Sequence, residues 1–406
     1  MSSMSRNKAI AVFLAFAFAY FLSALIRAIT ATIAPTLVAE FQLQSADLGL
    51  LAGGYFLGFA AMQLPLGKWL DSHGPRKVEL FFLAAALAGC IAFSQADGFV
   101  GLLFARILCG IGVCACLMAA LTGYRRWFAP EQLMRANSWM LMVGAFGMVA
   151  STLPVQWLLP VIGWRGIFLV LAALMLISMA LIAWQVPAWE APATAAGATP
   201  QAQGYAEVWR NPYFRALAPL GFVNYGGLVA MQTLWAGPWM TKVAGYTPAQ
   251  AASGLFWLNV AMLLAYWLWG LANPWLARNG HTAEKMIRRW VPVSFVMLAI
   301  LIIAGPALSV GAAVVFALYC VASTVAALAQ PAVGMAFPAG LAGRALSAYN
   351  LVIFAGVFAV QWGLGLLLDV LKAQGLPEVQ AFQVAFAAFG GASVLAYLVA
   401  CRAKTP

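Results

Sequence analysis

The chain has 406 residues, of which 64% are hydrophobic and only 8% are charged. A water-soluble domain of this length needs far more charge to cover its surface, so the composition excludes an ordinary soluble protein. The net charge of +11 does not indicate a nucleic-acid partner, because the basic residues fall in alternate loops and form no patch interleaved with exposed aromatics.

Twelve apolar stretches recur along the chain, and a helix needs about 20 apolar residues to cross a bilayer. The first six are 9–34, 47–69, 78–95, 99–123, 136–159 and 166–186. The second six are 215–240, 247–272, 290–308, 311–337, 346–369 and 379–401. We therefore predict an all-α membrane protein with twelve transmembrane helices.

The segment between the two sets of helices, 187–214, has a different composition. Its part 191–201 is rich in Ala, Pro and Thr, which is typical of a flexible linker, and 207–214 carries aromatics suited to a membrane interface. We predict an N-terminal six-helix bundle over 1–186, a cytoplasmic linker over 187–214, and a C-terminal six-helix bundle over 215–406.

The basic residues are distributed asymmetrically. Most lie in the two terminal segments and in five loops on one side, whereas the opposite loops hold only Arg165, Lys242 and Lys372. Basic loops stay on the cytoplasmic side of a membrane, with anionic lipid headgroups as their natural contact. We therefore expect a bacterial inner-membrane protein with both termini in the cytoplasm.

The two halves repeat each other weakly. The sequence Arg-Ala-Asn-Ser from Arg135 resembles Arg-Ala-Leu-Ser from Arg344, and Gly147 and Gly356 are separated by the same offset. Parallel repeats of six helices imply a pseudo-two-fold axis along the membrane normal, with a ligand site between the halves.

One loop carries a recognisable motif, Gly67-Lys-Trp-Leu-Asp71-Ser-His-Gly74-Pro-Arg76-Lys77. It resembles the signature loop between helices two and three of the major facilitator superfamily. The segments 106–110 and 163–168 resemble motifs of helices four and six of the same superfamily. The resemblance covers essentially the whole chain, and it implies two helical bundles around a central cavity that opens alternately to each side.

The motif has departures from the family pattern and a mechanical rationale. Ser72 and Pro75 replace residues that are usually basic, and the glycine-proline motif of drug exporters in helix five is missing. The N-terminus of helix eleven carries a partial positive charge, against which Asp71 can sit. The resemblance implies a conformational gate made of Gly67, Asp71, Gly74, Arg76 and Lys77. The alternative is a charged loop that only fixes the topology.

Two arginines fall inside predicted spans. Arg27 lies seven residues before the outer end of helix one, and Arg106 lies seven residues after the outer end of helix four. Both are therefore about 10 Å below the outer rim. An intramembrane charge costs about 3 kcal/mol or more and usually faces water or a partner.

No acidic residue is available in mid-span to balance these arginines. The eleven acidic residues all fall in predicted loops or at predicted helix ends: Glu40, Asp47, Asp71, Glu79, Asp97, Glu131, Glu190, Glu207, Glu284, Asp369 and Glu378. An anionic substrate would supply the missing negative charge, and a guanidinium suits a carboxylate or phosphate. Arg27 and Arg106 are thus predicted substrate contacts. A structural pair between Arg27 and Asp47 is the alternative.

Polar residues of helix seven complete the predicted substrate site. Asn224, Tyr225 and Gln232 lie close to Gly-Gly and Gly-Pro sequences that allow bending. Four weaker candidates, each more often an interhelical hydrogen-bonding residue, occur in other spans: Asn259, Gln330, Asn350 and Gln361.

The source of energy is less clearly indicated. No Gly-Lys-Ser/Thr nucleotide-binding sequence is present, both histidines fall in loops, and the six cysteines lie in apolar stretches without metal-ligand spacing. We expect no cofactor and no metal. Asp47 and Asp369, at outer helix ends, are weak candidates for proton coupling, with solvated end charges as the alternative.

The sequence therefore predicts a secondary transporter and not an enzyme. We expect proton-coupled uptake of a small organic anion by alternating access in a monomer embedded in lipid. Two alternatives remain open, a proton-driven exporter of amphiphilic compounds and a solute receptor that does not transport. Accumulation assays separate the first alternative, and flux in proteoliposomes separates the second.

Overall fold

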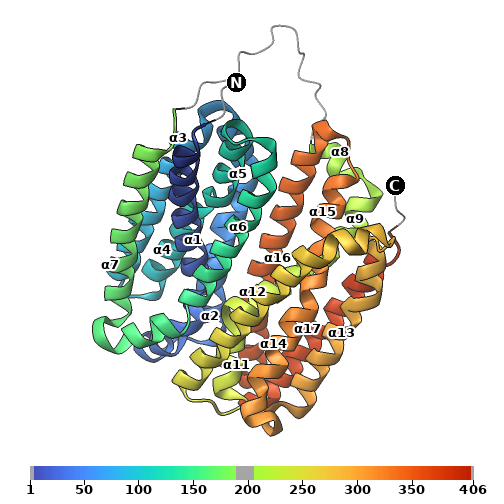
Figure 1. The fold of residues 1–406 in the computed structure, drawn as a ribbon. Helices are drawn as coiled ribbons and strands as arrows, with labels where there is room; N and C mark the ends of the chain where they lie inside the picture. The colour runs from blue at the N-terminus through green and yellow to red at the C-terminus, as the bar shows by residue number, and fades with distance from the viewer. Residues whose placement is uncertain (1–3, 189–204, 404–406) are drawn as a thin grey trace.

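The computed structural model describes residues 4–188 and 205–403. Every regular element in these ranges is a helix, which confirms the predicted all-α class. Figure 1 shows the earlier helices, blue to green, on one side of the molecule and the later helices, yellow to red, on the other.

The helices of the earlier part are α1 (Arg6–Phe41), α2 (Ser45–Ala61), α3 (Gln63–Ser94), α4 (Phe99–Val113), α5 (Cys116–Trp127), α6 (Pro130–Ala150) and α7 (Leu153–Gln185). The α-helices of the later part are α8 (Tyr205–Arg210), α9 (Pro212–Pro219), α10 (Gly226–Ala230), α11 (Ala236–Lys242), α12 (Pro248–Arg278), α13 (Ala283–Ala304), α14 (Ala312–Ser323), α15 (Ala329–Met335), α16 (Ala339–Ala373) and α17 (Glu378–Ala400). Two π-helical and two 3-10 segments connect some of them: η1 (Leu220–Tyr225), η2 (Met231–Trp235), η3 (Gly305–Gly311) and η4 (Thr324–Leu328).

The predicted spans fall largely on helical residues, but the breaks between helices differ from those expected. The predicted loop near Gly74 is helical on both sides, and the chain turns only at Gly74, whose φ of 75° favours glycine. The fourth predicted span is interrupted after Val113, so that α4 and α5 are separate. Within the described residues, eight helices are long and apolar enough to cross a membrane, by length and composition.

The apolar core is divided between the two halves of the chain. One cluster of buried side chains comes almost entirely from α1 to α7, and only Ala230 and Val357 join it from the later half. Two further clusters come mainly from the later helices. The bundles 1–186 and 215–406 and the linker 187–214 stay predictions, and 189–204 lies outside the described residues.

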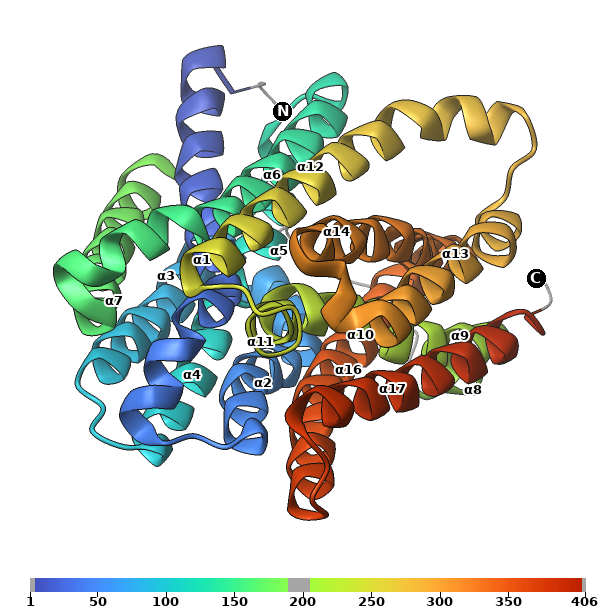
Figure 2. The ribbon, with the colours of Figure 1, turned by 90° about the horizontal axis from the view of Figure 1, so that it is seen from below.

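The two halves meet most closely where α2 packs against α16. We call the end of the molecule that carries Gln42 and Gly375 the distal end, and the end that carries Arg6 and Gly74 the proximal end. A Cβ on Gly49 would lie 2.4 Å from the backbone oxygen of Gln361, so glycine is required for this approach. Figure 2, seen from the distal end, shows α2, α11 and α16 close together at the centre.

Candidate functional site

The two predicted arginines lie on either side of one tyrosine of α2. The Arg106 guanidinium carbon lies 5.1 Å from the centroid of the Tyr55 ring, and the Arg27 guanidinium also interacts with Tyr55. A cation over an aromatic face is attracted by the ring quadrupole. α1, α2 and α4 therefore bring both positive charges to one place inside the first half of the chain.

Arg106 is held inside the protein. It is only 1% exposed, and its Nη1 donates a hydrogen bond of 3.0 Å to the backbone oxygen of Ile26 on α1. Its Nε and Nη2 are buried without a hydrogen-bond partner. Arg106 thus fixes the turn of α1 next to Arg27, and Tyr55 lies between the two side chains.

Arg27 is more accessible. The residue is half-buried, its guanidinium carbon lies 5.7 Å from the Phe59 ring centroid, and its Nε is buried without a hydrogen-bond partner. The hydroxyls of Tyr20 and Tyr55 lie beside it. The alternative pairing with Asp47 is not seen, because the Asp47 carboxylate accepts from the backbone N–H of Gln44 and caps α2 instead.

The later half of the chain contributes two tyrosines to the surroundings of Arg27. Tyr225 of η1 interacts with Arg27 and Tyr20, and Tyr266 of α12 lies beside Tyr225. Tyr266 is nevertheless 41% exposed. A side chain that is both exposed and in contact with these inner residues borders accessible space beside Arg27. The ring centroids of Phe59 and Phe354, only 4.4 Å apart, join the halves next to this space.

The other predicted residues of helix seven point elsewhere. Asn224 lines a small cavity within the second half together with Ser294 and Ser393. Gln232 donates a hydrogen bond of 2.8 Å to Asn259 Oδ1 on α12. Their role as substrate contacts therefore stays a prediction, and of the three helix-seven residues only Tyr225 lies near Arg27.

The weaker polar candidates form hydrogen bonds between helices, as their residue types favour. Gln330 Nε2 donates to Asn350 Oδ1 over 2.5 Å. Gln361 Nε2 donates to Thr233 Oγ1 over 2.9 Å. These side chains hold neighbouring helices together. Tyr225 in η1 and Gln232 in η2 both contact α12, Tyr225 at Tyr266 and Gln232 at Asn259.

The residues of the predicted gate lie at the proximal end, and three of them are exposed. Gly67 and Asp71 are exposed, as is Lys77, and a Cβ on Gly67 would meet no atom within 4 Å. Gly74 is buried at the turn, and the Arg76 guanidinium donates to the backbone oxygen of Ala183 on α7. α3, which carries the gate, packs against α16, but Asp71 is exposed and makes no hydrogen bond or ion pair with another described residue.

Asp369, a weak candidate for proton coupling, has a structural role that the sequence did not suggest. Its carboxylate accepts hydrogen bonds from the backbone N–H groups of Ser45 and Ala46, over 3.1 and 2.6 Å. Lys372 Nζ lies 3.1 Å from the same carboxylate. Asp369 therefore joins α16 to the N-terminus of α2 at the distal end instead of facing solvent as an isolated charge.

One acidic residue was misjudged from the sequence. The sequence predicts Glu79 at a helix end, but it lies inside α3 and is 0% exposed, and neither of its carboxyl oxygens has a hydrogen-bond partner among the described residues. The expectation that the interior holds no acid is therefore wrong. The signal was available, because Glu79 follows Val78 and precedes an apolar run that begins at Leu80.

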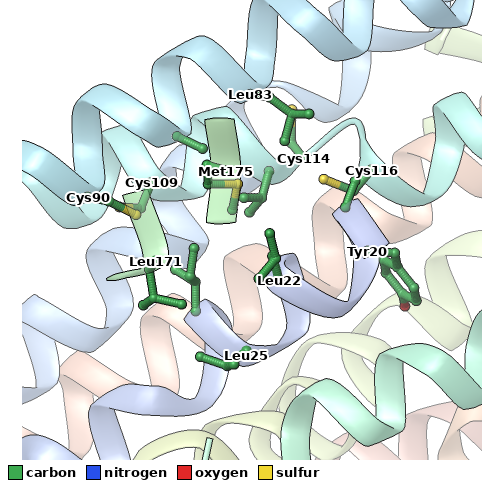
Figure 3. Close-up of a cluster of buried hydrophobic side chains, with 14 of the residues drawn as sticks. Tyr20, Leu22, Leu25, Leu83, Cys90, Cys109, Cys114, Cys116, Leu171 and Met175 are labelled. Carbon is green, nitrogen blue, oxygen red and sulfur yellow. The ribbon is translucent and has the colours of Figure 1, made fainter. Parts of the chain in front are cut away.

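Five of the six cysteines are buried in the apolar interior, and Cys401 is half-buried. All six are free, and Cys90, Cys109, Cys114 and Cys116 are buried between the helices of the first half (Figure 3). No group of three or more metal-ligating side chains is found among the described residues.

Comparison with curated proteins finds three partial relatives. An uncharacterized transporter of Bacillus subtilis (strain 168), YybO, is 29% identical over 143 residues, which are 35% of this chain and 32% of the relative. A probable L-galactonate transporter of Escherichia coli (strain K12) is 26% identical over 34% of this chain and 31% of its own. The nitrate/nitrite transporter NrtP of Picosynechococcus sp. (strain ATCC 27264 / PCC 7002 / PR-6) is 30% identical over 33% and 25%. The matches thus span less than a third of each relative.

Solved structures match over almost the whole length. A bacterial homologue of the human lysosomal transporter Spinster has a TM-score of 0.77 at 18% identity and covers 98% of both chains. A D-xylose–proton symporter has a TM-score of 0.77 at 15% identity and covers 98% of this chain and 100% of its own. At this identity the likeness concerns the fold. The family model of the Major Facilitator Superfamily matches residues 16–361, and the chain belongs to that family.

Proposed function

We propose that the chain is a secondary transporter that takes up a small organic anion together with protons by alternating access. Its bundles 1–186 and 215–406 would move about the linker 187–214, in a bacterial inner membrane with the proximal end in the cytoplasm. The observation that carries this proposal is Arg27, a half-buried cation in the middle of α1 that borders accessible space and has no carboxylate partner within 4–188 and 205–403.

The chemistry around Arg27 suits an anion. A guanidinium offers a planar pair of donors to a carboxylate or a similar oxyanion. The hydroxyls of Tyr20 and Tyr225 lie beside it and can donate further hydrogen bonds, whereas the Tyr55 hydroxyl donates to the Ser23 backbone oxygen. Arg106, behind Tyr55, adds a second positive charge and positions Arg27 through the hydrogen bond to Ile26. Asn224 and Gln232 would take part only after a rearrangement of their helix.

The contacts between the halves support alternating access. The distal end is joined by Asp369 and by the close approach of α2 and α16, whereas Gly67 and Asp71 at the proximal end are exposed. This is the arrangement of a carrier that faces the proximal side. We propose that Asp71, together with Gly74, Arg76 and Lys77, engages α16 in the opposite state.

Two of the partial relatives support an anionic substrate. They are named for L-galactonate and for nitrate or nitrite, which are all anions. Both matches cover only about a third of this chain. We therefore commit to the charge of the substrate and not to its identity.

A binding experiment tests the proposal. Purified protein is heated with L-galactonate, D-gluconate, lactate or nitrate, and with D-xylose as a neutral control. A ligand that binds the folded state at 100 times its Kd stabilises that state by about 2.7 kcal/mol, so at least one anion is expected to raise the melting temperature. Arg27→Gln should abolish the shift and Arg27→Lys should retain part of it. Stabilisation by xylose alone, or an unchanged shift in Arg27→Gln, would contradict the proposal.

The direction of transport needs a separate measurement. The anion that shifts the melting temperature is supplied to cells that express the protein, and its accumulation is followed with and without a proton gradient. Accumulation that depends on the gradient supports uptake. Faster loss of preloaded anion would instead identify an exporter.

A further inference from the structure

Glu79 is a fully buried ionisable group in the described part of the chain. It lies on α3, five residues after the turn at Gly74, with no exposed surface and no hydrogen bond to either carboxyl oxygen. An ionised carboxylate in such surroundings costs many kcal/mol, so the group neutralises instead. Burial therefore favours the neutral, protonated form of Glu79 in this conformation.

The groups that face Glu79 do not compensate a negative charge. The neighbouring ionisable side chains are the thiols of Cys114 and Cys116, at the junction of α4 and α5, and the Tyr124 hydroxyl of α5. No basic side chain among the described residues acts on the Glu79 carboxyl. α7 packs against α3, and none of its buried residues titrates at ordinary pH.

We propose that Glu79 is the site that binds the coupling proton. This inference rests on the proposed function, and it replaces Asp47 and Asp369 as the candidates for that role. The carboxylate takes up one proton and becomes a neutral carboxylic acid, and the reverse step returns the proton to water. Nothing else is consumed or formed.

A chain of polar groups links Glu79 to the arginine site. The Cys116 thiol lies next to both Glu79 and Ser23. Ser23 Oγ donates to the backbone oxygen of Val113 over 3.5 Å, and the Ser23 backbone oxygen accepts from the Tyr55 hydroxyl over 3.4 Å. Tyr55 in turn contacts the two arginines. Figure 3 shows Cys116 on the side of Tyr20, which also borders Arg27.

The position of Glu79 also explains how a proton can change the conformation. Cys114 and Ala115 separate α4 from α5, and Glu79 acts on Cys114, so Glu79 lies beside the break in this pair of helices. Loss of the proton leaves a charge that this packing cannot accommodate, and the equilibrium moves toward a conformation in which the carboxylate reaches water or a cation. The conformation with the distal end joined is thus the proton-loaded one.

Infrared spectroscopy tests the protonation without any substrate. Difference spectra of the purified protein in lipid are recorded across a pH titration, and the carboxylic C=O band is compared between wild type, Glu79→Gln and Glu79→Asp. We expect a protonated carboxyl band that disappears in Glu79→Gln, shifts in Glu79→Asp, and persists in the control Asp97→Asn, whose side chain is 97% exposed. A band that is unchanged in Glu79→Gln would overturn the proposal. If Glu79→Gln does not fold, the shift in Glu79→Asp decides.

Transport measurements separate this inference from the proposed function. The probe is whichever of the four test anions raises the melting temperature. In proteoliposomes, Glu79→Gln is expected to keep counterflow exchange of that anion within about twofold of wild type and to lose accumulation driven by a pH gradient, because exchange requires no net proton movement. Retained gradient-driven accumulation in Glu79→Gln would overturn the role of Glu79 but leave the anion site intact. If none of the anions binds in the wild type, the proposed function fails, whereas the infrared result still decides the protonation of Glu79.

Discussion

The Asp369 carboxylate accepts a hydrogen bond of 2.6 Å from the backbone N–H of Ala46, which ties the C-terminal end of α16 to the N-terminal end of α2. A second bond from the Ser45 N–H and the nearby Lys372 ammonium strengthen this contact. The first turn of a helix carries a partial positive charge, so a carboxylate is favoured there. The sequence predicts a corresponding contact at the proximal end, where the Asp71 carboxylate would meet the N-terminus of α16.

Replacement of Asp369 by Asn tests the distal contact. Hydrogen bonds to charged groups contribute about 1.5–3 kcal/mol, and every 1.4 kcal/mol changes an equilibrium about tenfold. We expect Asp369→Asn to shift the population about ten- to a hundredfold toward the conformation that is open at the distal end. Spin labels on Gln42→Cys and Gln374→Cys, both exposed at the distal end, report the separation in a Cys401→Ser background.

The control for this experiment is Asp97→Asn, because Asp97 is an exposed acid at the same end that lies near Arg165 of the same half. It should leave the label distances unchanged. A distance distribution that is the same in Asp369→Asn and wild type would mean that α2 and α16 stay together at the distal end without the Asp369 carboxylate.

Two glycines of α16 offer a matched pair of substitutions. A Cβ on Gly365 would lie 2.3 Å from the backbone oxygen of Ser45, whereas a Cβ on Gly363 would meet no atom within 4 Å. We therefore expect Gly365→Ala to separate α2 from α16 at the distal end and to reduce transport at least tenfold. Gly363→Ala should transport normally. Equal transport by both variants would show that the close approach of α2 and α16 is not required.

The two arginines should differ in their effect on anion binding. Arg27 borders accessible space, whereas Arg106 is 1% exposed and holds the backbone of α1 through Ile26. We expect Arg27→Gln to weaken anion binding about a hundredfold, since two charge-assisted hydrogen bonds of about 1.5 kcal/mol each are lost. Arg106→Gln should weaken it about tenfold and also lower the melting temperature of the ligand-free protein. Calorimetric titration measures both, and a larger loss in Arg106→Gln would make Arg106 the direct contact.

Asp71 should matter for transport and not for the stability of the conformation described. Its side chain is exposed and makes no hydrogen bond or ion pair recorded among the described residues. Asp71→Asn is therefore expected to leave the melting temperature within about a degree of wild type while slowing net transport, because the opposite state loses its proximal contact. A strongly lowered melting temperature would contradict this prediction, because it would mean that Asp71 already makes a stabilising contact in the resting protein.

The repeated apolar stretches were enough to predict the fold, because a bilayer restricts the chain to helices of a nearly fixed length. They could not predict the break after Val113 or the π-helical turns around Tyr225, which depend on packing between helices. Of the predicted site, Arg27 and Arg106 do lie close together. A charge inside a membrane span is costly and usually faces the interior of the bundle, so two such charges tend to meet there. The burial of Glu79 and the capping role of Asp369 depend on which helices meet, and one sequence does not specify that.

The ring contact between Phe59 and Phe354 lies near the C-terminal end of α2 and near the middle of α16, between Asp369 near one rim and Asp71 near the other. If α2 and α16 rock about this contact, their proximal ends approach each other only as their distal ends separate. With this motion the two helices would not separate at both ends at once, so no continuous water channel would form between them. The barrier against proton leak would then depend on how the two helices rock and not on whether a substrate is bound.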